Sequence, residues 1–442
     1  MKKLVKGVTL TTLATMLASS IGCGSNFSTM IPMIDNNMLN SQLSYYQAKK
    51  LANRAETKDW TIFVHLAAEN NLYSCGLDDI NEMEAGLSAT AAQNVNVIVL
   101  FDGIKNGDSV IYKIKPDKSY DKNIISEKIN DKGEVIPVNT HEIDSGSKET
   151  FKKFLMWGVA NFPAQNYMVD IWDHGSGIFR GKRTFLKKVF AMDDGTGSEM
   201  KTKDLNYVLP DVAKLAGKKI DILGFDACLM GHVEIGYQVK DSVSYLVASE
   251  ETEPGDGWDY MAWLKKLSSN TKATAAAVGS ALVETFGASY TNGSQGNAQD
   301  STLAVSNLNA LTGVLVPSIN QFADALTSSL STSQEVISNV RSSTQTFYNY
   351  DCADIYDFAN QISKADVPAN VKSAAVNVVS AMKKTVVKEW HGSQVKTAGG
   401  LVIYFPNIDD YFNSTYTNPS EILFAQEKPW TNFLKSFLQK TR

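Results

Sequence analysis

The chain has 442 residues, of which 43% are hydrophobic and 20% charged, as in an ordinary globular protein with one large or two medium domains. Its formal net charge of −5 and its lack of basic runs give no reason to expect nucleic acid as a partner. No HExxH, CxxC, GxSxG or P-loop pattern is present, so zinc enzymes, serine hydrolases of the α/β-hydrolase type and P-loop enzymes are not supported.

The first residues have the pattern of an export signal. Lys2, Lys3 and Lys6 give a positive start, and the apolar or small stretch 8–21 is too short to span a membrane comfortably. It ends in Ser20-Ile21-Gly22-Cys23, which resembles a bacterial lipoprotein signal, although Ser20 stands where Leu is usual. We therefore interpret 1–22 as a signal peptide and Cys23 as a lipidated N-terminus that anchors an exported protein to a membrane surface. The alternative is an ordinary cleaved signal with an incidental cysteine.

Residues 23–57 are polar and rich in Asn, Ser and Gln, which is typical of a tether, with one short helix expected near 43–54.

From residue 58 onward, apolar runs alternate with helical patterns. Buried strands are predicted at 60–66, 95–101, 167–172, 220–225 and 243–248, a further strand at 108–114, and helices at 77–87, 148–161, 202–216 and from about 231. Continuous apolar strands alternating with helices indicate an α/β fold with a mostly parallel sheet covered on both faces. In such sheets the functional site lies at the carboxyl ends of the strands.

The pattern changes near residue 259 and becomes mainly helical. Helices are predicted around 263–264 and at 273–286, 308–330, 371–386 and 430–438, with strands at 302–306 and 399–405. We expect a core at 58–265 and a C-terminal part at 266–442 that packs on this core.

Two of the predicted strands end in reactive side chains. The strand 167–172 leads through Asp173 into His174, and the strand 220–225 leads through Asp226 into Cys228, 54 residues further on. That separation is enough for one crossover between parallel neighbours, so the imidazole and the thiol would meet at the strand tips. A thiol nucleophile beside an imidazole is the arrangement of a cysteine peptidase, and a helix from Gly231 would assist with its positive end. The alternative for a single histidine is a structural role, which we assign to His65, His141, His232 and His391.

Gly175 and Cys228 are the candidate oxyanion donors. A tetrahedral intermediate needs backbone N–H groups aimed at its oxygen, and a glycine after the histidine allows the sharp turn that exposes one. The remaining cysteines, Cys75 and Cys352, either pair in an oxidising compartment or remain two separate thiols, and we prefer the second interpretation.

The motifs around these residues resemble the clostripain family of cysteine peptidases. The matching segments are Asp173-His174-Gly175-Ser176-Gly177, 224–231, 248–258, 60–81 and 400–406. The resemblance covers most of 58–442. It implies a caspase-like three-layer α/β/α fold, a His174–Cys228 dyad and cleavage after Arg or Lys.

Two carboxylates are candidates for binding such a basic side chain. Asp226 lies two positions before Cys228, and Asp256 lies in a Gly-rich loop after the next strand. A buried carboxylate pairs with a guanidinium or ammonium group. The resemblance favours Asp256 at the base of the pocket with Asp226 near its mouth. For Asp226, a loop-capping role is an equal alternative.

The stretch 179–191 between the dyad residues is basic and is expected to form an exposed loop. Members of the family are commonly activated by self-cleavage in this region, so we expect cleavage after Lys187 or Lys188, with the intact loop blocking the site. The alternative is a solvated loop that is never processed.

No cofactor is expected to be required, and calcium is the one candidate because some relatives depend on it. The acidic pairs Asp193-Asp194 and Asp78-Asp79 offer oxygen ligands but lie in no recognisable calcium loop, so we favour a solvated-surface role and assign no metal ligands.

The sequence thus predicts an exported, lipid-anchored cysteine endopeptidase acting on protein or peptide substrates with Arg or Lys at the cleaved bond. Two alternatives stay open. One is a catalytically silent surface lipoprotein of the same fold that acts as a binding module. The other is a caspase-fold peptidase of different specificity, against which the negative charges of Asp226 and Asp256 argue.

Overall fold

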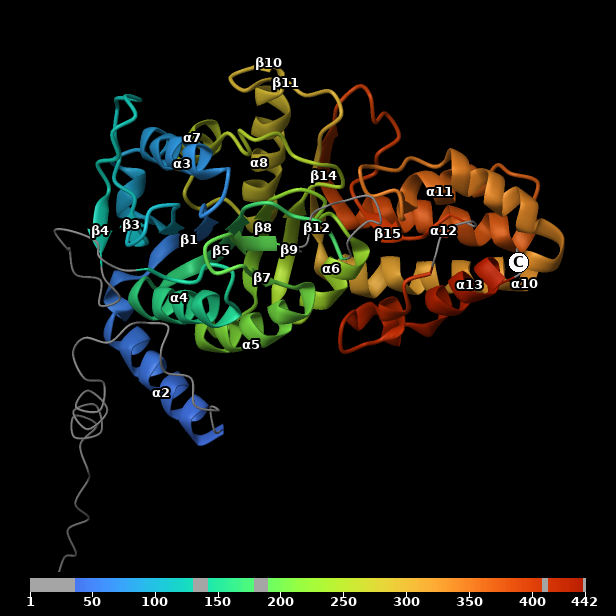
Figure 1. The fold of residues 1–442 in the computed structure, drawn as a ribbon, viewed down its shortest axis with the longest axis horizontal. Coiled ribbons are helices and arrows are strands. Elements are labelled where there is room, and N and C mark those ends of the chain that lie inside the picture. Colours follow the sequence, from blue (N-terminus) through green and yellow to red (C-terminus); the bar gives the residue numbers. More distant parts are fainter. Residues whose placement is uncertain (1–35, 130–141, 179–189, 408–411, 440–442) are drawn as a thin grey trace, which may run out of the picture.

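The computed structural model describes residues 36–129, 142–178, 190–407 and 412–439. At its centre is a nine-stranded sheet in the order β14-β12-β9-β8-β5-β1-β2-β3-β4 (Figure 1). The five middle strands are parallel: β9 (Val243–Ala248), β8 (Ile220–Asp226), β5 (Ala164–Trp172), β1 (Lys58–Ala67) and β2 (Val95–Asp102). Each run predicted as a buried parallel strand therefore forms one.

Antiparallel strands extend the sheet at both edges. β3 (Val110–Lys113) and β4 (Glu127–Ile129) lie beyond β2, while β12 (Thr302–Asn307) and β14 (Val386–His391) lie beyond β9. β14 was not predicted, because its residues are partly exposed and follow a helix directly. Through these two strands the C-terminal part of the chain continues the central sheet.

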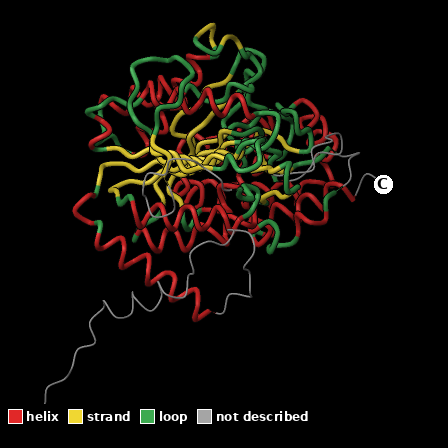
Figure 2. The backbone as a smooth tube through the Cα atoms, turned by 60° about the vertical axis from the view of Figure 1, so that its left-hand side comes forward, coloured by secondary structure: helices red, strands yellow, loops and turns green. Residues whose placement is uncertain are grey.

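The sheet is covered by helices on both faces, as Figure 2 shows. Ile62, Val64 and Leu66 of β1 pack toward α3 (Tyr73–Gly86), α7 (Tyr260–Ser269) and α8 (Ala275–Ser289). Phe63 of β1 faces the other way, toward α4 (Lys148–Asn161) and α5 (Leu205–Ala216). Because side chains alternate along a strand, apolar residues at every position bury both faces. The three-layer α/β/α architecture predicted from the sequence is confirmed.

A helix precedes the first strand. α2 (Asn36–Ala52) contacts α4 and α5, with Leu43 buried between them. The Lys50 ammonium donates to the carbonyl oxygens of Leu215 and Ala216 at the carboxyl end of α5, where cations are favoured. The expected helix at 43–54 is thus longer and begins earlier. Contacts with α4 and α5 stabilise α2, whose sequence shows no periodic apolar face.

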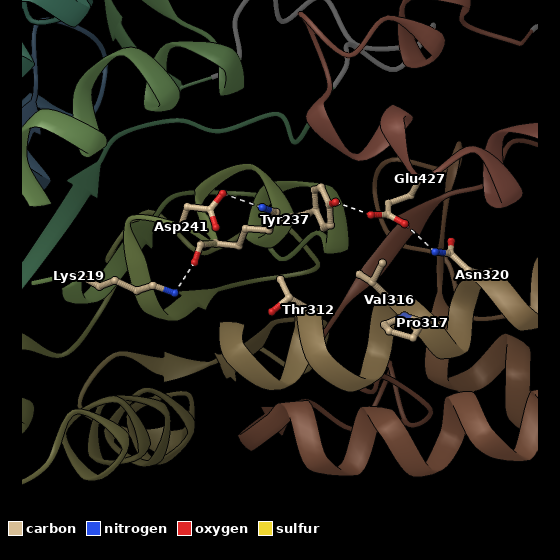
Figure 3. Close-up of a pocket in the computed structure, with 9 residues that line it drawn as sticks. Lys219, Tyr237, Asp241, Thr312, Val316, Pro317, Asn320 and Glu427 are labelled. Carbon is tan, nitrogen blue, oxygen red and sulfur yellow. Dashed lines mark hydrogen bonds and ion pairs between the residues drawn. The ribbon is translucent and has the colours of Figure 1, made fainter.

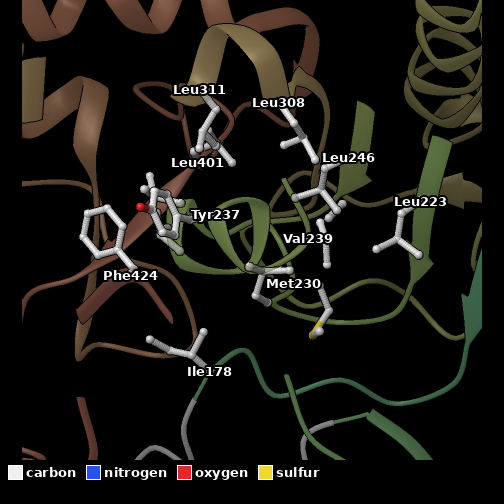
Figure 4. Close-up of a cluster of buried hydrophobic side chains, with 14 of the residues drawn as sticks. Ile178, Leu223, Met230, Tyr237, Val239, Leu246, Leu308, Leu311, Leu401 and Phe424 are labelled. Carbon is white, nitrogen blue, oxygen red and sulfur yellow. The ribbon is translucent and has the colours of Figure 1, made fainter. Parts of the chain in front are cut away.

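The C-terminal half adds a second helical layer at one end of the sheet (Figure 1). It comprises α9 (Leu308–Ala310), a π-helical turn (Leu311–Leu315), α10 (Val316–Ser343), α11 (Ile355–Ile362), α12 (Ala369–Thr385) and α13 (Lys428–Gln439). Its core is continuous with that of α6 (Val233–Val239), where Tyr237 meets Leu311, Leu401 and Phe424 in one buried cluster (Figure 4). No helix among the described residues is long and apolar enough to cross a membrane.

The remaining elements are short. They are β6 (Phe190–Asp193) paired with β7 (Ser198–Met200), β10 (Thr291–Gly293) with β11 (Gly296–Asn297), β13 (Cys352–Asp354) with β15 (Val402–Tyr404), and 3-10 turns at Arg54–Glu56, Ala91–Gln93, Thr202–Asp204, Ser414–Thr417 and Leu423–Gln426. The strand predicted at 399–405 is β15, outside the main sheet.

We expect Trp430→Ala to lower the free energy of unfolding by about 3–5 kcal/mol. The Trp430 ring is fully buried beside Phe405, and its Nε1 donates to the Tyr404 carbonyl at 2.9 Å. Val376→Ala, at an exposed position of α12, should change stability by less than about 0.5 kcal/mol. Denaturant unfolding of both variants measures the difference. Equal effects would show that the closing helix contributes little to the fold.

Candidate active site

The parallel register of β5 and β8 brings the two predicted site loops side by side. Trp172 is paired with Asp226 at the ends of the two strands. His174 lies two residues after Trp172, and Cys228 lies two residues after Asp226. The Asp173 N–H donates to the Asp226 carbonyl at 3.2 Å. Beyond it, a Cβ on Gly175 would come within 2.3 Å of the Cys228 carbonyl oxygen. The two loops are therefore in backbone contact, and only glycine fits at position 175.

The turn that carries Cys228 is held tightly. Leu229 adopts φ +64°, a left-handed conformation that is unfavourable for leucine. Hydrogen bonds from Leu229 N–H to the Glu251 carbonyl and from Gly231 N–H to the Ser249 carbonyl hold this turn against the loop after β9. A Cβ on Gly231 would lie 2.9 Å from the Ser249 carbonyl group, so this position also needs glycine. These hydrogen bonds therefore fix the turn that carries the Cys228 thiol.

The Cys228 thiol is partly buried, and its Sγ accepts the Glu253 N–H at 3.3 Å. Burial raises the pKa of Cys228, only partly offset by this hydrogen bond, and the nearby carboxylates of Glu251 and Asp226 raise the pKa further. The expected assistance from a helix at Gly231 is not supported. The helix α6 begins only at Val233, and its dipole is effective only within its first turn. Forming the thiolate therefore requires a base.

A neighbour that the sequence analysis missed orients the histidine. Asn71, between β1 and α3, places its Oδ1 2.8 Å from His174 Nε2. An amide oxygen only accepts hydrogen bonds, so this contact puts the imidazole proton on Nε2 and makes Nδ1 the basic nitrogen. Asn71 lies inside the segment 60–81 that resembles the clostripain opening. The resemblance of that segment was the signal that could have pointed to Asn71, although nothing in the segment distinguishes Asn71 from Asn70.

The adjacent Asn70 holds the same loop through Asp173. Its Nδ2 donates to Asp173 Oδ1 at 2.7 Å, and the Met192 N–H donates to Oδ2. Gly175 also forms an antiparallel bridge with Phe190, the first described residue after the basic loop. The end of that loop therefore lies against the histidine turn. Lys187 and Lys188, like Cys23, fall outside the described residues.

Asp226 lies beneath the loop that carries Asp256. It is buried, and its Oδ2 accepts from the Tyr260 hydroxyl at 2.9 Å and from the Trp258 N–H at 3.2 Å. Burial raises the pKa of Asp226 to about 6, so its carboxyl group is ionised only above that pH. These contacts are the ones expected of a loop-supporting carboxylate. Asp256 is exposed on the same loop, where its backbone carbonyl accepts from Gln295 at 2.8 Å.

Other buried carboxylates, which the sequence analysis did not assign to the site, surround Asp226. The Tyr260 hydroxyl donates to Asp170 at 2.6 Å, and Trp172 Nε1 donates to Asp79 at 2.7 Å. Burial raises the pKa of Asp79, Asp170 and Glu253, and the charge of Asp226 adds to each rise. The side of the site toward α3 and α7 is therefore lined by buried carboxyl groups that hold their protons more readily than exposed ones.

A cavity of about 370 Å³ lies elsewhere (Figure 3). Lys219, immediately before β8, lines it together with Tyr237, whose hydroxyl donates to Glu427. Because Lys219 precedes β8 and Cys228 follows it, this cavity lies at the amino-terminal end of β8, whereas the predicted site lies at its carboxyl end. Cys75 and Cys352 are separate thiols, as preferred from the sequence.

A sequence model of the clostripain family matches residues 64–437. The chain belongs to the clostripain family. Clostripain from Hathewaya histolytica is 30% identical to this chain over 244 residues. The matched region spans 51% of this chain and 44% of that protein, so the chain covers less than half of the length of this relative. The family resemblance of the sequence motifs is thereby confirmed.

Solved structures share the fold. A secreted C11 cysteine protease from Bacteroides thetaiotaomicron, in complex with an irreversible peptide inhibitor, has a TM-score of 0.63 at 18% identity and covers 84% of this chain and 99% of its own. An inactive zymogen C11 protease from Parabacteroides distasonis has a TM-score of 0.55 at 17% identity and covers 79% and 93%. These likenesses support the caspase-like architecture expected of a clostripain-family chain.

In this clostripain-family chain, we expect Asn71→Ala to lower kcat by about tenfold or more with little change in KM, because the imidazole loses its orientation. Asn71→Asp keeps an accepting oxygen and should restore most of the rate. Its added charge should shift the acid limb of the pH profile upward, because a carboxylate stabilises the imidazolium. Steady-state kinetics across pH measure both effects, with the exposed Asn270→Ala as control. Wild-type kinetics in Asn71→Ala would contradict this role.

Proposed function

We propose that the protein is an exported cysteine endopeptidase that cleaves peptide bonds after Arg or Lys. The observation that carries the proposal is the backbone contact between the loops of His174 and Cys228 at adjacent strand ends. Membership of the clostripain family supports the same chemistry.

The proposed reaction uses these loops as follows. His174 Nδ1 takes the proton from Cys228 Sγ, and the thiolate attacks the scissile carbonyl carbon. The N–H groups of Gly175 and Cys228 stabilise the oxyanion. The imidazolium then protonates the leaving amine, which departs and leaves a thioester. Water attacks the thioester with His174 as general base, releasing the acid product and the thiol.

The acidic surroundings support specificity for a basic residue. Asp256 is placed on the exposed face of the loop whose underside contacts Asp226, so it can pair with an incoming guanidinium or ammonium group. Asp226, whose pKa is raised to about 6, adds negative charge from beneath that loop at neutral pH. The same charges repel an acidic side chain, which disfavours a peptidase that cleaves after aspartate.

The proposed location is a membrane surface of the bacterial cell envelope, reached by export and lipidation at Cys23. The signal-like residues 1–23 support this proposal. The similar protease from Bacteroides thetaiotaomicron is described as secreted.

Activation is proposed to occur by self-cleavage after Lys187 or Lys188. The bridge between Gly175 and Phe190 supports this, because it brings the end of the basic loop next to the catalytic turn. The protease from Parabacteroides distasonis is described as an inactive zymogen.

Fluorogenic peptides that differ only in a final Arg, Lys, Asp or Ala test the activity. We expect kcat/KM for Arg or Lys to exceed that for Asp by about 100-fold or more, and Cys228→Ala to abolish hydrolysis. Asp256→Asn should reduce the preference, whereas Asp366→Asn, an exposed aspartate in the C-terminal part, should not. Preference for another residue would rule out selection of Arg or Lys by the acidic pocket, but it would leave Cys228 as the nucleophile. No hydrolysis, even after trypsin and added calcium, would favour a binding module.

N-terminal sequencing of purified wild type and Cys228→Ala tests self-processing. We expect a new N-terminus at residue 188 or 189 in the wild type only, because cleavage needs the thiol. Fragments in both proteins, or in neither, would reject self-cleavage.

A further inference from the structure

Two exposed tyrosines lie on one loop of the C-terminal part. The loop 344–351 joins α10 to β13, and the side chains of Tyr348 and Tyr350 are 50% and 57% exposed. Their neighbours Phe347 and Asn349 are buried, so burial alternates along this segment and both tyrosine rings lie on its outer side. Exposed aromatic rings gathered at one place are typical of a binding surface.

The backbone of this tyrosine loop is held by charged side chains. The Tyr348 N–H donates to both carboxylate oxygens of Glu251, each at 3.0 Å, and Glu251 also accepts the Thr252 N–H at 2.7 Å. The buried Arg341 guanidinium donates to the Tyr350 carbonyl at 2.7 Å. The tyrosines are therefore exposed on a fixed backbone, which lowers the entropy that a ligand must overcome to bind them.

Glu251 connects the tyrosine loop to the nucleophile. Its backbone carbonyl accepts the N–H of Leu229, the residue after Cys228, at 3.0 Å. Two residues further along the same segment, the Glu253 N–H donates to Cys228 Sγ at 3.3 Å. One residue thus bridges the tyrosine loop and the turn that carries the thiol, so a ligand that contacts both is sterically reasonable.

The order of the strands decides which part of a substrate would reach the tyrosines. His174 follows β5, Cys228 follows β8 and Glu251 follows β9, and the three strands are neighbours in that order across the sheet. In the proposed reaction the imidazolium protonates the leaving amine, so the chain after the cleaved bond lies toward β5. The chain before the cleaved bond then lies toward β9, on the side of the tyrosine loop.

The alternation of side chains along an extended peptide selects one position in that chain. Trp258, beside Asp256, is buried in the core that contains α3 and α7, whereas Phe347 is buried in the core on the other face of the sheet. Successive side chains of an extended chain point to opposite sides. Since the proposed function directs the cleaved Arg or Lys to Asp256, the residue before it points toward Tyr348 and Tyr350.

We propose that Tyr348 and Tyr350 bind an apolar or aromatic side chain of the substrate, in the residue immediately before the cleaved Arg or Lys. This inference rests on the proposed peptidase function and adds a second determinant to its specificity. An apolar side chain packed against the two rings is removed from water, whereas a glycine at the same position buries almost no surface.

Blocked fluorogenic dipeptides with the sequences Phe-Arg, Leu-Arg and Gly-Arg test this site, because they differ only before the cleaved residue. We expect kcat/KM for Phe-Arg and Leu-Arg to exceed that for Gly-Arg by about tenfold or more in the wild type. In the double variant Tyr348→Ala with Tyr350→Ala, this ratio should fall to about threefold or less. Both peptides are cleaved by one preparation, so the ratio does not depend on the fraction of folded enzyme.

Two further variants serve as controls for the double alanine variant. Tyr348→Phe with Tyr350→Phe keeps both rings and should retain the preference for Phe-Arg. Tyr45→Ala removes an exposed tyrosine of α2 and should leave the ratio at the wild-type value.

The outcomes separate this site from the proposed function. Cleavage of Gly-Arg with no wild-type preference for Phe-Arg, or with a preference unchanged in the double alanine variant, would overturn the tyrosine site alone. Failure to cleave any of the Arg peptides would reject the proposed function together with it. Internally quenched peptides with Phe or Gly directly after the Arg test the placement. A preference for Phe there that the double alanine variant loses would contradict binding before the cleaved bond.

Discussion

The parallel pairing of β5 with β8 is the constraint on which the whole site depends. Because Trp172 lies opposite Asp226, the residues that follow the two strands must turn away from the sheet at the same place. A glycine at 175 lets the two turns touch, and a strained leucine at 229 with a glycine at 231 directs the thiol. The remaining helices and edge strands bury the faces of this pair and hold its register.

Electrostatics around the thiol oppose its ionisation, and they bear on the basic specificity proposed for the site. Burial and neighbouring carboxylates raise the pKa of Cys228, so the free enzyme holds a protonated thiol that depends on His174. Asp226 and Glu251 accept hydrogen bonds, but neither forms an ion pair with a lysine, arginine or histidine of the described segments. A guanidinium or ammonium group arriving beside Asp256 would supply a positive charge at the moment when the thiol has to react. Under the proposed function, specificity and activation of the nucleophile would in this way be linked.

The sequence predicted the parallel strands and the meeting of the His174 and Cys228 loops well, because long apolar runs ending in distinctive motifs leave few alternatives. It predicted less where stability comes from contacts distant in the chain. The polar helix α2 is held by Leu43 and by Lys50 on the end of α5, and no apolar period marks it. Asn71 reaches His174 only when the loop after β1 meets the loop after β5, which no local pattern encodes.

The most direct measurement is to map the adduct formed with a thiol-reactive peptide ketone ending in Arg, with a matched peptide ending in Asp. Three described cysteines compete for the reagent: Cys75, Cys228 and Cys352. This account predicts a single adduct on Cys228, formed about 100-fold faster or more with the Arg peptide and slowed strongly by His174→Ala. An adduct on Cys75, or equal rates for the two peptides, would contradict it.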